Sequence, residues 1–530
     1  MRIKLTPVVA GLCLLGVVST PAFAATDAAA PNEDQLIEKL SQQTAALQKQ
    51  VSQLQKQVRY LKSHQPATPE VQNANTESNA NVTGGDIPGQ SVHGNLATNK
   101  AATSGLVAPK PSVVGRVGDE PLYITGSPIV TAPFLGERSA FDASDLIISY
   151  PSIGTDLLLL QQRQKIYNVY QQSGLPLPTD PIVDLSGGVE AQVLGQKPYS
   201  GAKTTDADLT RAEIDVGANI NTWATGYMAI VYDDLPPADG VGPRVSNSNI
   251  YLDKGFITIG NLSRTPFYST IGQIYVPFGR YSSYMLTSPL TKDLGRLQER
   301  AVVLGYDQNY GTTELSASTF AFNGDSYTSN PNKIDNPGAD IQYKFNGDSW
   351  NWSLGASYIN NIADSLGMQA NGATTGFGGF GETGGNEQLQ HAIPAYDLRG
   401  SVGFGHFSLL GEYVNTFHEF SQQDLTFNNH GAQPSALDVE AAYNFPVFDK
   451  PSSIAVGYGM SKEALALLIP QKRYITAFNI SVWKDTVETI EYRHDMNYGG
   501  STATGSGNTV TTSGLGNSSD TVTLQIGVYF

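Results

Sequence analysis

Charged side chains recur at every second position along several apolar segments of this sequence. In one of them Glu213 lies between Ala212 and Ile214. Side chains of a β-strand point alternately to opposite faces, so this spacing gathers the charges on one face. Such a face can hydrate a passage and select solutes by charge. The cations at these positions are Arg211, Lys344, Arg399 and Arg493, and the anions are Glu213, Asp215, Asp340, Asp397, Asp438, Glu440 and Glu491. The simpler interpretation is that these charges pair with one another and only keep the face hydrated.

A second group of cations lies in one long polar segment, Gly279 to Leu297. It holds Arg280, Lys292 and Arg296 together with two tyrosines. Basic and aromatic side chains together suit an anionic, oxygen-rich solute. We therefore expect this segment to form a constriction that anions pass.

Histidines and nucleophiles show no catalytic pattern. His418-Glu419 lacks a second histidine four residues later, so the zinc-protease motif is absent. Asp424 and His430 follow in the same segment, where a solvated loop is a simpler interpretation than a metal site. The sequence therefore predicts no enzymatic activity, no cofactor and no bound metal.

The elements that would position these charges are strands. We predict sixteen of them. Many have a length near the roughly 9–11 residues that a strand needs to cross a bilayer at a tilt. Very short turns such as Gly405-His406 alternate with long polar loops such as 361–395. This alternation is typical of an all-β transmembrane barrel of antiparallel strands. The predicted strands are 183–195, 209–220, 224–233, 248–260, 270–278, 299–307, 312–322, 338–346, 350–360, 396–404, 407–417, 436–445, 452–460, 473–483, 486–495 and 520–530.

The last predicted strand ends the chain on an aromatic residue. Val522, Leu524, Ile526 and Val528 alternate up to Phe530. This pattern resembles the signal that the barrel-assembly machinery reads, so we expect that machinery to be a partner through Phe530. A further expected partner is the lipid bilayer of the outer membrane.

The N-terminus predicts export. Basic residues precede an apolar run, and Ala22-Phe23-Ala24 offers small residues at the cleavage positions, so residues 1–24 are expected to be a signal peptide. Cleavage removes Cys13, the one cysteine. It also removes two of the 32 basic residues, which leaves 30 basic and 48 acidic residues and a net charge of −18. A chain this acidic is a poor binder of nucleic acid.

Residues 25–65 contain a heptad pattern. Leucine recurs every seven residues from Leu40 to Leu61, with Ile37, Val51 and Val58 three residues before a leucine. This spacing predicts a short α-helical coiled coil in the periplasm, able to join copies of the chain, although a single amphipathic helix fits too. Residues 66–110 are predicted to form a flexible linker. Residues 111–181 are predicted to form a periplasmic cap or an inward plug, with a helix at Thr155–Gln172. The barrel is expected over 182–530.

The whole layout resembles the LbtU-like siderophore porin family. The likeness includes the stretches Leu122–Phe134, Asp145–Gly154 and Gly272–Tyr281. The resemblance implies an outer-membrane receptor for a ferric siderophore of the polycarboxylate kind, without the plugged 22-stranded design. Two alternatives stay open: a less selective porin for small anions or other nutrients, and a structural or adhesive outer-membrane protein.

Overall fold

The computed structural model describes residues 112–117, 120–125, 127–131, 153–172, 181–233, 249–347, 350–370, 387–483, 485–505 and 514–530. The predicted signal peptide, the predicted coiled coil and the predicted linker lie outside these residues. Within them, no helix has both the length and the apolar character needed to cross a membrane.

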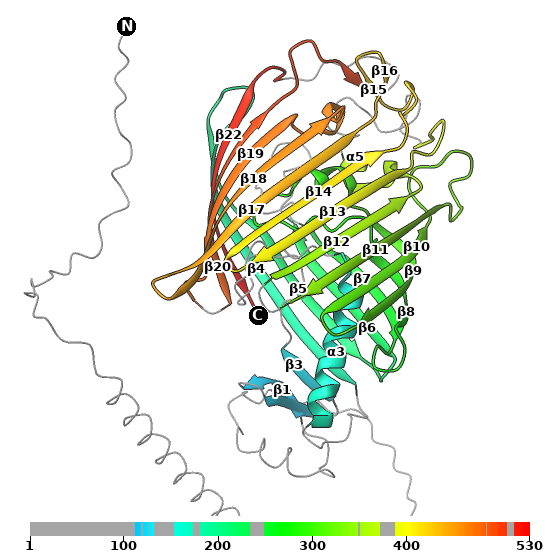
Figure 1. The fold of residues 1–530 in the computed structure, drawn as a ribbon, viewed down its shortest axis with the longest axis vertical. Helices are drawn as coiled ribbons and strands as arrows, with labels where there is room; N and C mark the ends of the chain where they lie inside the picture. Colours follow the sequence, from blue (N-terminus) through cyan, green and yellow to red (C-terminus); the bar gives the residue numbers. More distant parts are fainter. Residues whose placement is uncertain are drawn as a thin grey trace, which may run out of the picture. The chain divides into compact units, whose positions relative to one another are not determined.

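Sixteen antiparallel strands form a closed barrel, because the last strand β22 pairs with the first strand β4. The barrel predicted from the sequence is thereby confirmed. Its strands run obliquely in Figure 1, with the long loops at one end. The strands are β4 (Ile182–Lys197), β5 (Thr204–Asn219), β6 (Ala224–Asp233), β7 (Asn249–Gly260), β8 (Phe267–Tyr275), β9 (Gln298–Asn309), β10 (Thr313–Phe322), β11 (Asn336–Asn346), β12 (Trp350–Ile359), β13 (Ala395–Phe404), β14 (Phe407–Thr416), β17 (Ser435–Val447), β18 (Lys450–Lys462), β19 (Lys472–Ile480), β20 (Thr486–Met496) and β22 (Ser518–Tyr529).

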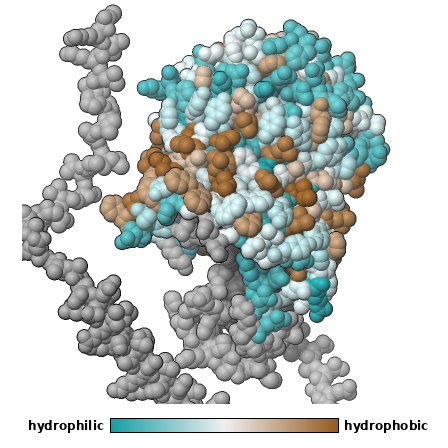
Figure 2. Space-filling model, in the orientation of Figure 1, coloured by the Kyte–Doolittle hydropathy of each residue, from teal (hydrophilic) through white to brown (hydrophobic). Residues whose placement is uncertain are grey.

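The strands alternate between an apolar exterior and a polar lumen. On β5, Ile214 is exposed while Glu213 and Asp215 are buried inside. Likewise Leu398 on β13 is exposed, whereas Asp397 is fully buried. Figure 2 shows the apolar residues gathered over the strands and a hydrophilic surface at the loop end. Because the outer face is apolar and the inner face charged, the barrel is built to stand in a bilayer with a hydrated interior.

A β-bulge interrupts this alternation on β7. Ala229 pairs with Lys254 and Ile230 with Leu252, so Asp253 is an extra residue opposite the partner strand. As a result the neighbours Asp253 and Lys254 are both buried. A bulge bends the strand and re-aims side chains, which is how two consecutive charged residues come to face inward.

Short elements fill the connections at the loop end. Between β8 and β9 lies α4 (Leu290–Gly295), and between β12 and β13 lie η3 (Ile362–Asp364) and α5 (Leu366–Ala370). The strands β15 (Thr426–Phe427), β16 (His430–Gly431) and β21 (Thr504–Gly505) form a small separate sheet. The helix η4 (Leu465–Leu467) lies between β18 and β19.

Within the described residues, four elements precede the barrel. The helix α3 (Thr155–Gln172) is found where the sequence predicts it, and it lies at the short-turn end of the barrel in Figure 1. The strands β1 (Ser112–Val117), β2 (Glu120–Thr125) and β3 (Ser127–Thr131) were not predicted. β3 pairs in parallel with β4, through Ile129–Thr131 and Val183–Leu185. The small sheet is therefore a continuation of the barrel wall.

Candidate functional site in the barrel lumen

The connection between β8 and β9, residues 276–297, folds into the barrel; we call it the lumen loop. Its Gly279 amide donates to the Ser357 hydroxyl on β12, and Asn479 on β19 donates to the Tyr284 carbonyl. These two wall strands are far apart around the barrel. The loop therefore crosses the lumen, as the sequence led us to expect for Gly279–Leu297.

A row of wall carboxylates holds the backbone of the lumen loop. The amides of Arg280 and Tyr281 donate to the two oxygens of Glu412, each at 2.7 Å. Further along, Tyr284 donates to Glu440 at 2.6 Å and Leu286 to Glu491 at 2.7 Å. We call Glu412, Asp438, Glu440 and Glu491 the carboxylate row, because Asp438 likewise accepts from the Thr291 amide at 2.9 Å.

The returning half of the lumen loop is packed rather than solvated. Leu290, Leu294 and Leu297 are fully buried in one apolar cluster. Residues from the connections after β12, β14 and β18 join the same cluster, among them Met368 and Phe420. Apolar packing on one side and the carboxylate row on the other thus hold the lumen loop in one position.

Tyr281 has a backbone conformation that its side chain disfavours. Its φ is 54°, in the left-handed region, and the side chain is 1% exposed. The hydroxyl has no hydrogen-bond partner among the described residues, and burial raises the pKa of this phenol well above its usual range. A non-glycine residue here costs about 1–2 kcal/mol. The bonds to Glu412 are what offset this strain.

Two of the predicted cations meet at one aspartate. Arg399 contacts Asp340 at 2.5 Å and Asp397 at 2.6 Å. Arg280, from the lumen loop, lies 3.7 Å from the other oxygen of Asp340. Gly355, directly opposite Arg399, gives it room, since a Cβ there would lie 2.6 Å from the Arg399 Nε. Asp340 therefore joins the lumen loop to the wall.

The other predicted cations also have acidic or aromatic neighbours. Arg211 contacts Glu213 at 2.6 Å, Lys344 contacts Glu314 at 2.9 Å, and Arg493 contacts Asp495 at 3.2 Å. The guanidinium of Arg296 lies 5.0 Å from the ring centre of Tyr275. Lys292 is half-buried in α4. The structure brings Arg280 together with Arg399, and it leaves Arg211 and Lys344 on separate parts of the wall.

Several residues of this site were missed by the sequence analysis. Arg473 on β19 donates to the Ser288 carbonyl at 2.8 Å and contacts Asp293 at 3.7 Å, so it anchors the far end of the lumen loop. It alternates with the exposed Tyr474, so the period of two could have revealed it. Glu412 could have been found in the same way. Lys254 could not, because the β7 bulge breaks the alternation.

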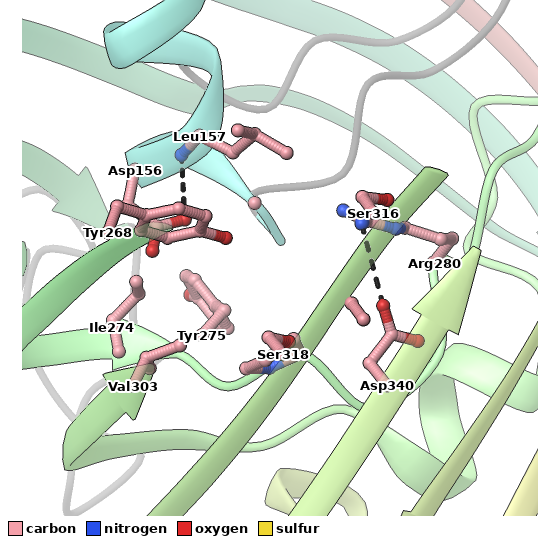
Figure 3. Close-up of a pocket in the computed structure, with 13 residues that line it drawn as sticks. Asp156, Leu157, Tyr268, Ile274, Tyr275, Arg280, Val303, Ser316, Ser318 and Asp340 are labelled. Carbon is pink, nitrogen blue, oxygen red and sulfur yellow. Dashed lines mark hydrogen bonds and ion pairs between the residues drawn. The ribbon is translucent and has the colours of Figure 1, made fainter. Parts of the chain in front are cut away.

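The helix α3 enters the lumen from the short-turn end and reaches the lumen loop. Arg280 donates to the Ile153 carbonyl at 3.1 Å, and Thr270 donates to Asp156 at 2.8 Å. Burial raises the pKa of Asp156, while the hydrogen bonds from Thr270 and from the Leu157 amide oppose the rise. Figure 3 shows Asp156, Tyr268, Arg280 and Asp340 around the space that remains. That cavity measures about 10 Å³, room for roughly one water molecule.

A metal site in the segment 418–435 finds no support in the described part of the chain. No group of three or more His, Cys, Asp or Glu side chains there could hold an ion. Asp424 instead accepts from the Gln390 amide at 3.0 Å, and His430 bonds to the Gly431 carbonyl. These side chains hold loops together.

In a closed barrel the backbone groups of each strand form hydrogen bonds with the neighbouring strands and need no water. A β-structure inside a bilayer requires this. The inward loop narrows the interior in the manner expected of a porin. Fold and lumen together define an outer-membrane β-barrel of the porin class.

The chain belongs to the UPF0422 protein family. It is 44% identical over 420 residues to the UPF0422 protein of Legionella pneumophila strain Lens, covering 77% of this chain and 78% of that protein. It is 40% identical over 403 residues to the UPF0422 protein of Coxiella burnetii, covering 75% of this chain and 83% of that protein. No family model matches the chain.

Solved structures with a similar fold are porins and outer-membrane channels. The anion-selective porin from Comamonas acidovorans is 12% identical, with a TM-score of 0.41, over 66% of this chain and 100% of that chain. OmpF of Salmonella typhi, in a complex with daunomycin, is 14% identical with a TM-score of 0.42, over 66% and 97% of the two chains.

Proposed function

We propose that this protein is a solute channel of the outer membrane and that it takes up a ferric siderophore of the polycarboxylate kind. In this proposal the short-turn end faces the periplasm, together with the N-terminal region, and the long loops face outward. The protein acts by passage and selection of solutes, without catalysis. The observation that carries the proposal is the lumen loop, which is fixed across the interior by the carboxylate row.

The selectivity of the channel is assigned to cations on and beside this loop. A ferric polycarboxylate siderophore is anionic, and a mature chain with a net charge of −18 would on average repel it. Local positive charge is therefore needed along the route. Arg280, Lys292 and Arg296 supply it on the loop, and Arg211, Lys344, Arg399 and Arg493 supply it on the wall.

A less selective channel for small anions is the second candidate. It is favoured by the pairing of the wall cations, since Arg211, Lys344 and Arg399 each contact a carboxylate. A wall whose charges compensate one another discriminates weakly between anions. In this candidate the three loop cations set a general preference for negative charge.

Single-channel recording in planar bilayers distinguishes the two candidates. For the siderophore channel, a purified ferric polycarboxylate siderophore blocks the current at low concentration, while citrate and the iron-free siderophore do not. For the general channel, all three act alike and only weakly. A protein that is folded in the bilayer and carries no current under any condition would contradict both.

A charge-matched pair of variants tests the loop cations. Arg280→Gln, Lys292→Gln and Arg296→Gln together should weaken the block by the ferric siderophore. The control removes three exposed cations from other segments, Arg264, Lys333 and Lys462. The loop effect should shrink in high salt, because the screening length falls from about 10 Å at 0.1 M to about 3 Å at 1 M. Equal loss in both triple variants would show that only net charge matters.

A further inference from the structure

The N-terminal half of α3 is seated on the barrel wall inside the lumen. Leu159 and Leu160 are buried, whereas Leu158 between them is 43% exposed. Wall glycines make the seat: a Cβ at Gly217 would lie 3.5 Å from Leu159, and one at Gly260 would lie 3.3 Å from Leu160. The helix is thus fitted to this wall by shape.

Two arginines join the helix to the channel. Arg163 on α3 donates to the Thr225 hydroxyl at 2.7 Å and also to the Gly260 carbonyl. Arg280 on the lumen loop donates to the Ile153 carbonyl, just before the helix begins. One contact fixes α3 to the short-turn end of the wall, and the other fixes it to the constriction.

The helix borders a small cavity on one side of the lumen. Between its first turn, the lumen loop and the strands β8 to β11 lies a cavity of about 10 Å³, whose lining is drawn in Figure 3. This space is lined by Asp156, Arg280, Ser316, Ser318 and Asp340. The lining also includes apolar side chains such as Leu157, Ile274 and Val303. A solute larger than about one water molecule does not fit into this cavity while α3 is in place.

The surface of α3 resembles that of an element made to stand in water. Its middle carries Gln161, Gln162, Gln164 and Lys165, and Lys165 is exposed. The apolar contacts that have to be broken when the helix leaves its seat are those of Leu157, Leu159 and Leu160 at its N-terminal end. Withdrawal of the helix would break the hydrogen bond from Arg280 to the Ile153 carbonyl, whereas Asp340 would stay beside Arg280.

We propose that α3 is a removable plug and that Arg280 is the specificity-determining residue that its withdrawal exposes to an anionic solute. The inference rests on the proposed channel function. With the helix seated, Arg280 is bound to Ile153 and the route along β8 to β11 is shut. With the helix withdrawn, Arg280 presents its guanidinium to the carboxylates of the solute. The anion selectivity of the channel therefore depends on the position of α3.

The test compares two identical substitutions on neighbouring residues of α3 in the full chain. Leu160→Asp puts a carboxylate against an apolar seat, whereas Leu158→Asp puts it at an exposed position. Single-channel recording should show an open fraction about tenfold higher for Leu160→Asp, because burying an unpaired charge is costly. Leu158→Asp should behave like the wild type. Arg163→Ala, which adds no charge, should also raise the open fraction, and the heat-modifiable band on a gel reports that each barrel is folded.

A second measurement tests Arg280. In the Leu160→Asp background, Arg280→Gln should lower the permeability ratio of anions to cations, whereas in the seated wild type it should change this ratio little. An open fraction in the wild type equal to that of Leu160→Asp would overturn the plug, although the channel function would stand. Failure of every folded variant to carry current would instead overturn the channel function.

Discussion

Tyr281 donates its backbone amide to the carboxylate of Glu412 at 2.7 Å, although the two residues are 131 positions apart in the chain. The contact joins a left-handed, buried residue of the lumen loop to the wall of β14. The loop cannot leave the wall at this point without losing both bonds to Glu412.

Glu412→Ala should therefore loosen the lumen loop. Two backbone hydrogen bonds to a buried carboxyl group are lost, at about 0.5–1.5 kcal/mol each, and the strain at Tyr281 is no longer offset. We expect more frequent current fluctuations in single-channel recordings and a lower unfolding temperature. Glu314→Ala is the matched control, because it removes another lumenal carboxylate that pairs with Lys344 and not with the loop. Equal fluctuations in the two variants would mean that apolar packing alone holds the loop.

Arg399→Gln should lower stability more than it changes selectivity. The substitution leaves Asp397 buried without its cation and leaves Asp340 with Arg280 alone, at 3.7 Å. Breaking a buried ion pair costs about 3–5 kcal/mol. The temperature at which the folded band converts on a gel should fall clearly. Lys344→Gln breaks an ion pair in which the lysine is 36% exposed, and exposed pairs are worth about 0–1 kcal/mol. A larger loss from Lys344→Gln would refute the distinction.

Phe530→Ala should reduce the amount of folded barrel in the outer membrane. Gly187 and Phe530 exchange two backbone hydrogen bonds, at 2.6 and 2.8 Å, and the ring of Phe530 covers Gly187. The residue thus completes the closure between β22 and β4, besides ending the predicted assembly signal. Phe448→Ala, at a turn residue that is 93% exposed, is the control. Heat-modifiable protein is measured in isolated membranes, and an unchanged amount for Phe530→Ala would count against the prediction.

The packing of the connection after β12 should weaken as the pH rises. Burial raises the pKa of Asp364 from 3.8 to about 6, against hydrogen bonds from Ser326 and Asn336. In the packed state Asp364 holds its proton between pH 4 and 6, whereas a released Asp364 does not. Stability is thus greatest below about pH 4, falls up to about pH 6 and is then flat, and the change is on the order of 3 kcal/mol.

Limited proteolysis of this connection at pH 5 and pH 8 measures the effect. Cleavage should be faster at pH 8, after correction for the pH dependence of the protease on an unfolded substrate. Asp364→Asn cannot ionise and should show the same cleavage at both values. A wild type that is cleaved equally at both values would mean that Asp364 stays accessible to water.

The sequence predicts the barrel well because strand periodicity is local. Ile214 points outward and Glu213 inward by the geometry of a strand alone, whatever their partners. The inward fold of the lumen loop was also expected. Its anchors were not, since Arg280 and Glu412 are 132 residues apart and nothing local pairs them. The predicted cations at Arg211, Lys344 and Arg399 were placed on the correct face, but their engagement by carboxylates depends on which strands become neighbours.

The small sheet beside β4 has a consequence for how the barrel closes. β5 covers one edge of β4 along nearly its whole length, so β3 and β22 share the other edge. β3 occupies it at Val183–Leu185, and β22 begins to pair at Gly188. A slip of the last strand by two or more residues toward the short-turn end would collide with β3. A slip by one residue would turn Val528 and Ile526 inward. β3 thus acts as a stop against slips toward the short-turn end, and it thereby helps to set the register, the shear and the bore of the finished channel.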